Sequence, residues 1–158
     1  MKKPVIGITC NYDYKDEVGM VSDMGTPGQD WNFVAGDYVY ILEKAGAVPV
    51  IIPQYENPQN VKSILDCLDG VVITGGHDVD PVCYGEFPKE YCGRVMPKRD
   101  RQDIEIANYF LLEKRNLFWE FVEEFRSSTL PAAELCTRIL LGKEGLKAIQ
   151  EADIRAMR

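Results

Sequence analysis

Histidine is nearly absent from this chain: His77 is the only one in 158 residues. The five cysteines form no C-x-x-C pair and their number is odd, which disfavours both a zinc site and a disulfide framework. We therefore expect no metal and no cofactor. A chain without disulfides fits a reducing compartment, so the cytoplasm is the expected location.

Positive charge and long apolar runs are also scarce. The 25 acidic residues outnumber the 18 basic ones and give a net charge of -7, so the chain lacks the basic surface that binds nucleic acid or an anionic membrane. The apolar run after Lys2 and Lys3 is too short for a signal peptide, and no segment approaches the length of a membrane span. We expect one compact domain and leave its oligomeric state open.

Three short apolar runs rich in β-branched residues predict buried parallel strands, at Pro4–Thr9, Ala47–Pro53 and Gly70–Thr74. Apolar residues at helical spacing predict helices between and after them. These run from about Asp30 to Ala45, from Asn57 to about Leu68 and from Arg99 to Lys114, and residues 10–29 are predicted to form a long loop. Gly46 suits a left-handed helix cap, and Asn57 followed by Pro58 suits a helix start. The alternation predicts an α/β fold with a three-layer parallel sheet.

The segment Gly75–Pro81, "GGHDVDP", follows the third predicted strand directly. Ligands of such sheets bind beyond the carboxyl ends of the strands, so this segment is the candidate site. Gly75 and Gly76 could expose backbone N–H groups to an oxyanion, or could form no more than a tight turn. Asp78 and Asp80 could orient a substrate amine, or could cap the loop backbone.

No residue outside that segment stands out as catalytic. The lone His77 could be a catalytic base, but a lone loop histidine is more often a surface residue, and the sequence places no cysteine beside it. Cys10, Cys67 and Cys136 have the surroundings of small core or helix residues, and none lies on a strand-to-helix elbow. We therefore assign no catalytic residue from the pattern.

Four segments together resemble the N-terminal half of class I glutamine amidotransferase-like hydrolases, of the γ-glutamyl-γ-aminobutyrate hydrolase type. They read "KPVIGIT", "LEKAGAVPVIIP", "LDGVVITGGHDVDPVCYGE" and "KRDRQDIEIA", and the resemblance covers about Lys3 to Arg115. It implies a flavodoxin-like sheet and a Cys-His-Glu triad that cleaves a small-molecule γ-glutamyl amide through a thioester. It also implies that Gly75 and Gly76 contribute to the oxyanion hole.

The chain departs from that family where the nucleophile should follow. The expected strand and elbow, of the form K-P-x-L-G-I-C-R-G-x-Q, are replaced by "RNLFWEFVEEFR" at Arg115–Arg126, and no G-x-C-x-G pattern occurs anywhere. The histidine expected downstream is missing as well, because His77 is the only one. As written, the chain lacks both nucleophile and base, so we expect no amidase activity.

The genetic code offers an explanation for the departure. Shifted codons take the third base of one codon and the first two of the next, so Phe118–Trp119 must encode leucine and Trp119–Glu120 must encode glycine. Continuing in this way permits L-G-I-C-R-G-I-Q, the missing elbow. We infer a frameshift near the codons for Lys114 and Arg115. The predicted division is residues 1–115 as the N-terminal part of the family domain and 116–158 as an out-of-frame, truncated tail.

A genuine amphipathic helix is the competing interpretation of the tail. Phe118, Phe121, Val122 and Phe125 fall at helical spacing, although short periodic windows often mislead. The tail is accordingly predicted to be helical or disordered, after an incomplete sheet. A non-catalytic α/β domain that binds a small amino-acid-like ligand or a partner subunit remains the alternative function.

Overall fold

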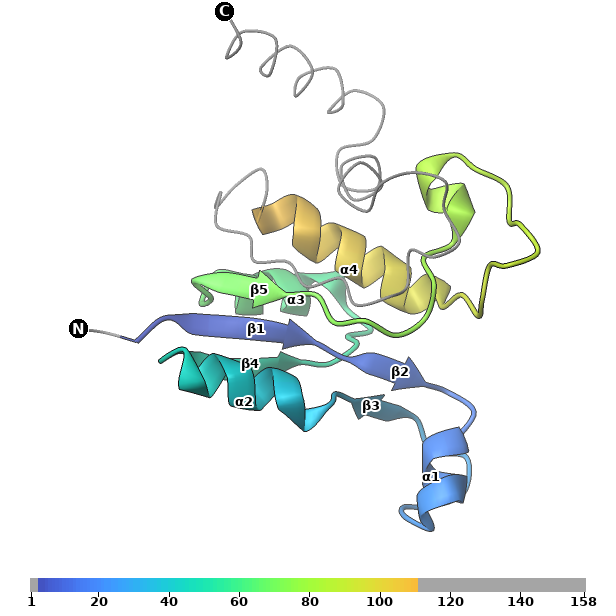
Figure 1. Cartoon of the computed structure of the whole chain (residues 1–158), viewed down its shortest axis with the longest axis horizontal. Coiled ribbons are helices and arrows are strands. Elements are labelled where there is room, and N and C mark those ends of the chain that lie inside the picture. The colour runs from blue at the N-terminus through green and yellow to red at the C-terminus, as the bar shows by residue number, and fades with distance from the viewer. Residues whose placement is uncertain (1–2, 111–158) are drawn as a thin grey trace, which may run out of the picture.

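The computed structural model describes residues 3–110. The sheet and helices follow one another along this part of the chain in the order predicted for an α/β fold, with additional short elements (Figure 1). They are β1 (Val5–Thr9), β2 (Asn11–Asp13), α1 (Glu17–Ser22), β3 (Trp31–Phe33), α2 (Gly36–Lys44), β4 (Val48–Ile52), α3 (Pro58–Leu65), β5 (Gly70–Val72), a 3₁₀ turn (Pro81–Tyr84) and α4 (Pro97–Tyr109).

The main sheet contains three parallel strands in the order β4-β1-β5. Helix α2 covers one face, and α3 and α4 cover the other, which gives three layers (Figure 1). The α/β class and the parallel sheet predicted from the sequence are confirmed. All three strands end on the same side, as parallel strands must, so the segments that follow β1, β4 and β5 gather at one edge of the sheet.

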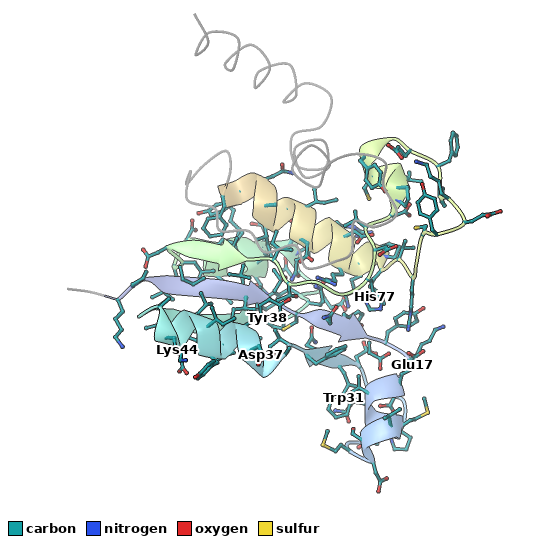
Figure 2. The ribbon with its side chains drawn as sticks, in the orientation of Figure 1. Glu17, Trp31, Asp37, Tyr38, Lys44 and His77 are labelled. Atoms are coloured by element: carbon teal, nitrogen blue, oxygen red, sulfur yellow. The ribbon has the colours of Figure 1, made fainter. Side chains whose placement is uncertain are left out.

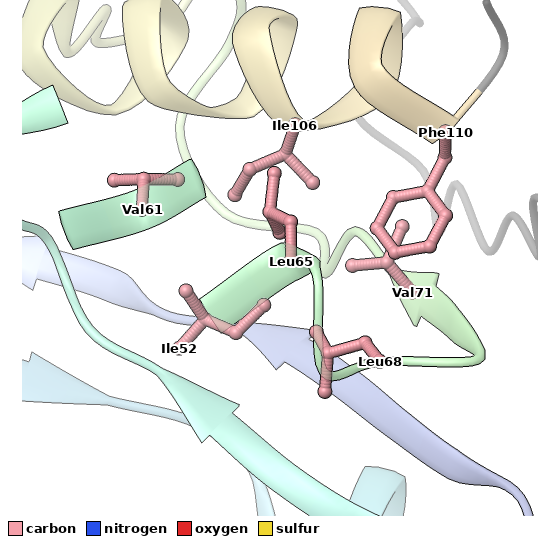
Figure 3. Packing of buried hydrophobic residues seen from close by; sticks show 7 residues of the cluster. All are labelled: Ile52, Val61, Leu65, Leu68, Val71, Ile106 and Phe110. Carbon is pink, nitrogen blue, oxygen red and sulfur yellow. The ribbon is translucent and has the colours of Figure 1, made fainter. Parts of the chain in front are cut away.

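The buried core lies between the sheet and the pair α3–α4. Its side chains come from β4, α3, the turn after α3, β5 and α4 (Figure 3): Ile52, Val61, Leu65, Leu68, Val71, Ile106 and Phe110. Gly7 in the central strand leaves room for this cluster, because a Cβ there would lie 2.6 Å from the Cδ1 atoms of both Ile52 and Leu68. Close packing of this kind fixes the strands that carry the carboxyl-end segments.

The outer edge of β4 is protected by its own sequence. Val48 donates its N–H to Pro4 of the neighbouring segment. Successive residues of a parallel strand direct their backbone N–H and C=O groups to opposite sides, so those of the next residue, Pro49, face away from β1. Proline has no N–H, so it leaves no unpaired donor on this edge. A proline at this position is typical of an edge strand.

Several predicted helix ends are confirmed. The Asn57 side chain accepts the N–H of Gln59 at 3.0 Å, with Pro58 at the first helical position, and Gly46 adopts the left-handed conformation (φ 86°) after α2. Helix α4 begins at Pro97, two residues before the predicted start. Its buried apolar residues are Ile106 and Ala107, and the buried Phe110 follows directly after its end.

The predicted loop at residues 10–29 was wrong in part. It contains β2 and α1, and β2 pairs with β3 in an antiparallel ribbon that joins Asn11 to Phe33. Helix α2 starts at Gly36, later than the change of pattern at Asp30 indicated, because the intervening residues belong to β3. Among the described residues, Cys10 is buried as expected, whereas Cys67 is exposed.

No helix within residues 3–110 has the length and apolar character needed to cross a bilayer. The predictions made for the tail fall on residues 111–158, outside the part of the chain that the structure describes.

Candidate ligand site at the carboxyl ends of the strands

The site begins where β1 and β5 stop pairing through their backbones. Thr74 donates its N–H to Thr9 Oγ1 at 3.1 Å, and its own hydroxyl donates to the Thr9 carbonyl at 3.0 Å. Both threonines are buried. These two bonds, each made by a threonine hydroxyl, hold the end of β1 to the segment after β5 where the double-glycine loop begins.

The loop backbone is held by side chains from two other elements. Asn11, at the start of β2, donates its Nδ2–H to the Gly75 carbonyl at 3.0 Å. The Gly75 N–H donates to the Tyr38 hydroxyl of α2 at 3.4 Å. The Gly76 N–H meets no acceptor within residues 3–110. One backbone donor of the loop therefore remains available to a ligand oxygen.

Arg99 of α4 supports the same loop from beneath. Its side chain is 4% exposed, and it donates from Nη1 to Asn11 Oδ1 at 2.8 Å, from Nη2 to the Thr74 carbonyl and from Nε to Asp103 Oδ2 at 3.1 Å. A guanidinium presents its donors in a fixed planar fork, so contacts in three directions fix the relative positions of its partners. Arg99 thus connects α4 to both segments that form the loop.

Gly76 is required by its surroundings. Its φ is +152°, and a Cβ there would overlap Asn11 Oδ1 and Arg99 Nη1. The second glycine is needed for close approach of the backbone to these two side chains, and no larger residue fits.

Two carboxyl groups accompany Arg99: Asp100 is buried, and the Asp103 side chain is 14% exposed. Burial raises the pKa of Asp103 to about 7, although the Arg99 charge acts in the opposite direction. Burial likewise raises the pKa of Asp100 to about 6, while its Oδ2 accepts the Asp80 N–H at 3.1 Å. Both groups are structural supports of the loop that titrate near neutral pH.

His77 follows the double glycine and is half-buried; Figure 2 shows it near the end of β2. Its Nδ1 atom is buried without a hydrogen-bond partner in the described part of the chain. Burial lowers the pKa of this imidazole, and the charges of Arg99 and Arg94 lower it further. The neutral imidazole is therefore favoured at pH 7.

Three of the described cysteines, Cys10, Cys83 and Cys92, are poorly suited to act as nucleophiles. Burial raises the pKa of the Cys10 thiol to about 11, with the charge of Asp103 adding to the effect. Burial also raises the pKa values of Cys83 and Cys92. A thiol that stays protonated at neutral pH is a poor nucleophile, so none of these three is suited to attack an amide.

These features can be compared with those of known proteins. The sequence profile of the Peptidase C26 family matches residues 4–118. The chain belongs to this family. That finding confirms the broader resemblance predicted from the four sequence segments.

Peptidase C26 membership agrees with the similarity to individual proteins. The chain is 35% identical, over 109 residues, to a Mycobacterium tuberculosis protein that carries the name of a glutamine amidotransferase; the match covers 66% of this chain and 32% of that protein. It is 32% identical over 77 residues to a Lactococcus lactis subsp. cremoris protein named as glutamine amidotransferase-like, covering 47% of this chain and 40% of the relative. The chain thus spans between a third and two fifths of the length of these curated relatives.

In this Peptidase C26 chain, Asp78 and Asp80 both bind loop backbone. Asp78 Oδ2 accepts the Gly93 N–H at 2.6 Å, and Asp80 Oδ1 accepts the Val82 N–H at 3.0 Å at the start of the 3₁₀ turn. The capping alternative considered for these residues is therefore present in the structure. Their role in substrate binding stays a prediction.

Three residues of this family site escaped the sequence interpretation: Asn11, Tyr38 and Arg99. Asn11 was assigned to an unstructured loop and Tyr38 to the apolar face of a helix. The Asn11–Arg99 contact joins residues 88 positions apart, so no local pattern could show it. The described residues contain no cluster of three or more His, Cys, Asp or Glu side chains able to hold a metal ion.

Proposed function

We propose that this chain carries the amide-binding part of a γ-glutamyl hydrolase site of the γ-glutamyl-γ-aminobutyrate type and binds γ-glutamyl amides without cleaving them. The observation that carries the proposal is the Gly76 N–H, the loop donor left without an acceptor among the described residues. Arg99 and Asn11 position this donor before any ligand arrives, as electrostatic stabilisation of an oxyanion requires.

In an intact enzyme of this type, a cysteine thiolate would attack the γ-glutamyl carbonyl carbon. The carbonyl oxygen would become an oxyanion, held by backbone amides that include those of Gly75 and Gly76. A histidine would protonate the departing amine as the carbon–nitrogen bond breaks, leaving a thioester that water hydrolyses. The Gly75 N–H would have to exchange the Tyr38 hydroxyl, at 3.4 Å, for the oxyanion.

A frameshift near the codons for Lys114 and Arg115 accounts for the missing nucleophile. It is supported by the elbow that the shifted codons permit. It is further supported by the family match, which ends at residue 118, within the anomalous segment. Resequencing the codons for Glu113 to Phe118 tests this origin directly, because one inserted base, or two deleted bases, restores the elbow.

Binding and inactivity are tested together on the purified 158-residue protein. In a ¹H–¹⁵N NMR titration with L-glutamine, the amide signals of Gly75 and Gly76 should shift in a saturable manner. No glutamate should be released from γ-glutamyl-γ-aminobutyrate. Metal-independent release of glutamate would contradict the inactivity, and unshifted glycine amides would contradict the binding site.

A dedicated non-catalytic binding domain is the second candidate, and the same unpaired Gly76 donor favours it. The two candidates differ in origin: a confirmed reading frame through codons 113–118 supports a domain that works by binding alone, whereas a corrected frame supports a hydrolase.

A further inference from the structure

An ion pair joins two segments beside the double-glycine loop. Arg94 Nη1 lies 2.9 Å from Glu17 Oε2, although 77 positions separate the two residues. The side chains are 38% and 53% exposed, so solvent reaches both. The Arg94 guanidinium also lies 5.8 Å from the centroid of the Tyr14 ring.

The backbone places this pair next to the site. The Asp78 N–H donates to the Arg94 carbonyl at 3.0 Å, and Asp78 forms a parallel bridge with Val95. Asp78 is two residues from Gly76, a separation of at most about 7 Å along an extended chain. Glu17 and His77 lie on the same side of the molecule in Figure 2, and the charges of Arg94 and Glu17 both act on the His77 imidazole.

Glu17 is exposed, but the backbone of the segment that carries it is fixed by hydrogen bonds to neighbouring elements. Asp13, at the end of β2, accepts the N–H groups of Lys15 and Val18, each at 2.9 Å. Asp16 accepts Trp31 Nε1–H at 2.7 Å and the Gly28 N–H at 2.8 Å. The start of α1 is thus bonded to β2 and to β3, and the Glu17 carboxylate is presented from a defined position.

A γ-glutamyl compound carries a matching pair of charges at its other end, an α-carboxylate and an α-ammonium group. Arg99 is not available to the carboxylate, because its side chain is buried and donates to three acceptors. Arg94 is exposed, and its guanidinium contacts the exposed side chains of Glu17 and Tyr14. An exposed ion pair contributes little to stability, so exchanging it for two ligand contacts costs little.

We propose that Arg94 and Glu17 recognise the zwitterionic amino-acid end of the ligand, Arg94 binding the α-carboxylate and Glu17 the α-ammonium group. The inference rests on the proposed function, in which the γ-carbonyl oxygen lies at the Gly76 N–H. A guanidinium suits a carboxylate because two parallel N–H donors match its two oxygens. Arg94 and Glu17 are specificity-determining residues in this arrangement and take no part in bond cleavage.

The test uses three ligands and three variants of the full chain, with dissociation constants from the Gly75 and Gly76 amide shifts. L-glutamine carries both charges, 4-carbamoylbutanoate lacks the ammonium group, and 4-aminobutanamide lacks the carboxylate. The variants are Arg94→Gln, Glu17→Gln and, as the matched control, Lys89→Gln. Lys89 pairs with Glu86 at 3.2 Å at comparable exposure, on the same segment between the 3₁₀ turn and α4.

The two variants Arg94→Gln and Glu17→Gln are expected to weaken the binding of different pairs of ligands. Arg94→Gln raises the dissociation constants of L-glutamine and 4-carbamoylbutanoate about tenfold or more, and changes that of 4-aminobutanamide by less than twofold. Glu17→Gln raises the dissociation constants of L-glutamine and 4-aminobutanamide to a similar degree and does not raise that of 4-carbamoylbutanoate. Lys89→Gln changes none of the three by more than twofold.

Two failures are distinguishable. If L-glutamine shifts the glycine amides of the wild-type chain but binds Arg94→Gln with unchanged affinity, the recognition by Arg94 and Glu17 is refuted and the proposed function stands. If L-glutamine shifts neither glycine amide of the wild-type chain, the proposed function fails and the recognition fails with it.

Discussion

At the scale of single residues, the double-glycine loop depends on contacts that leave no space for a side chain at Gly76. Gly76 touches Asn11 and Arg99 so closely that a methyl group would displace one of them, and its backbone conformation strains any other residue. Displacing either partner would release the carbonyl groups that Asn11 and Arg99 hold. The geometry of the available Gly76 donor therefore depends on five residues from β2, the segment after β5 and α4: Asn11, Thr74, Gly75, Gly76 and Arg99.

Replacing Gly76 by alanine is expected to reduce the free energy of unfolding by about 2–4 kcal/mol, since backbone strain and overpacking add. Urea denaturation measures this directly. Gly36→Ala is the matched control: a Cβ at Gly36 meets nothing within 4 Å, so that change should leave stability unchanged or raise it by up to about 1 kcal/mol. Equal stability of the two variants would contradict the close packing at Gly76.

The raised pKa of Asp103 predicts that the free energy of unfolding depends on pH. Its folded-state pKa, raised by burial to about 7, exceeds the ordinary 3.8, so the folded protein keeps this proton after the unfolded chain has lost it. Unfolding then releases a proton between about pH 4 and pH 7, and the free energy of unfolding falls as the pH rises, by at most about 1.4 kcal/mol per pH unit from this group.

Asp103→Asn removes that contribution while leaving a carbonyl oxygen to accept from Arg99. As the pH rises from 4 to 7, the free energy of unfolding of the wild type should therefore fall relative to that of Asp103→Asn. Denaturation at several pH values measures it, with the exposed Asp37→Asn as control. Wild-type and Asp103→Asn curves that stay parallel would show that Asp103 does not titrate in this range.

The sequence predicted the site at the level of its backbone but not of its side chains. Gly75 and Gly76 were found because a double glycine after a buried strand has few structural explanations. Arg99 could not be found, since an arginine in a helix rich in charged residues usually faces solvent. Its burial follows from Asn11 and Asp103, which the fold brings together from distant positions.

At the scale of elements, the strands of the main sheet were predictable because each is a short apolar run flanked by loop residues. The β2–β3 ribbon was not, since each strand has three residues and only one of the six, Tyr12, is a buried apolar side chain. Strands this short obtain their stability from pairing with each other and from side-chain contacts such as those of Asp13 and Asp16. No period-2 pattern of useful length results.

The packing of Gly7 in β1 against Ile52 of β4 and Leu68 of the turn after α3 yields a test of how these elements pack together. Gly7→Ala would place a Cβ 2.6 Å from the Cδ1 atoms of Ile52 and Leu68, and should cost about 1–3 kcal/mol of unfolding free energy by overpacking. Ile52→Val removes one of the two obstructing methyl groups and alone should cost about 0.5–1.5 kcal/mol. The double variant should be more stable than the sum of the two changes implies, by about 0.5 kcal/mol or more. Strict additivity in denaturant unfolding would contradict this packing.

At the scale of the whole molecule, the described residues form a coherent part of a Peptidase C26 domain. Three strands, the helices on both faces and the double-glycine loop are in place, and the chain spans between a third and two fifths of the length of its curated relatives. In the function we propose, the oxyanion side of the site and the nucleophile side are encoded by different segments. Under that proposal, the first side can persist in a chain from which the second is missing.

Restoring the reading frame should bring the two sides together. A gene in which one base is inserted near the codon for Lys114 is read onward in the shifted frame, whose codons at positions 118–124 permit the L-G-I-C-R-G elbow. Its product should release glutamate from γ-glutamyl-γ-aminobutyrate, where the 158-residue chain releases none, and serine in place of the elbow cysteine should abolish that release. Gly76→Ala in the restored protein should lower kcat/KM by at least about tenfold, because the oxyanion would lose a positioned donor. A restored protein that folds, as shown by cooperative unfolding, yet cleaves no γ-glutamyl amide would refute the hydrolase lineage, and with it the frameshift as the cause of inactivity.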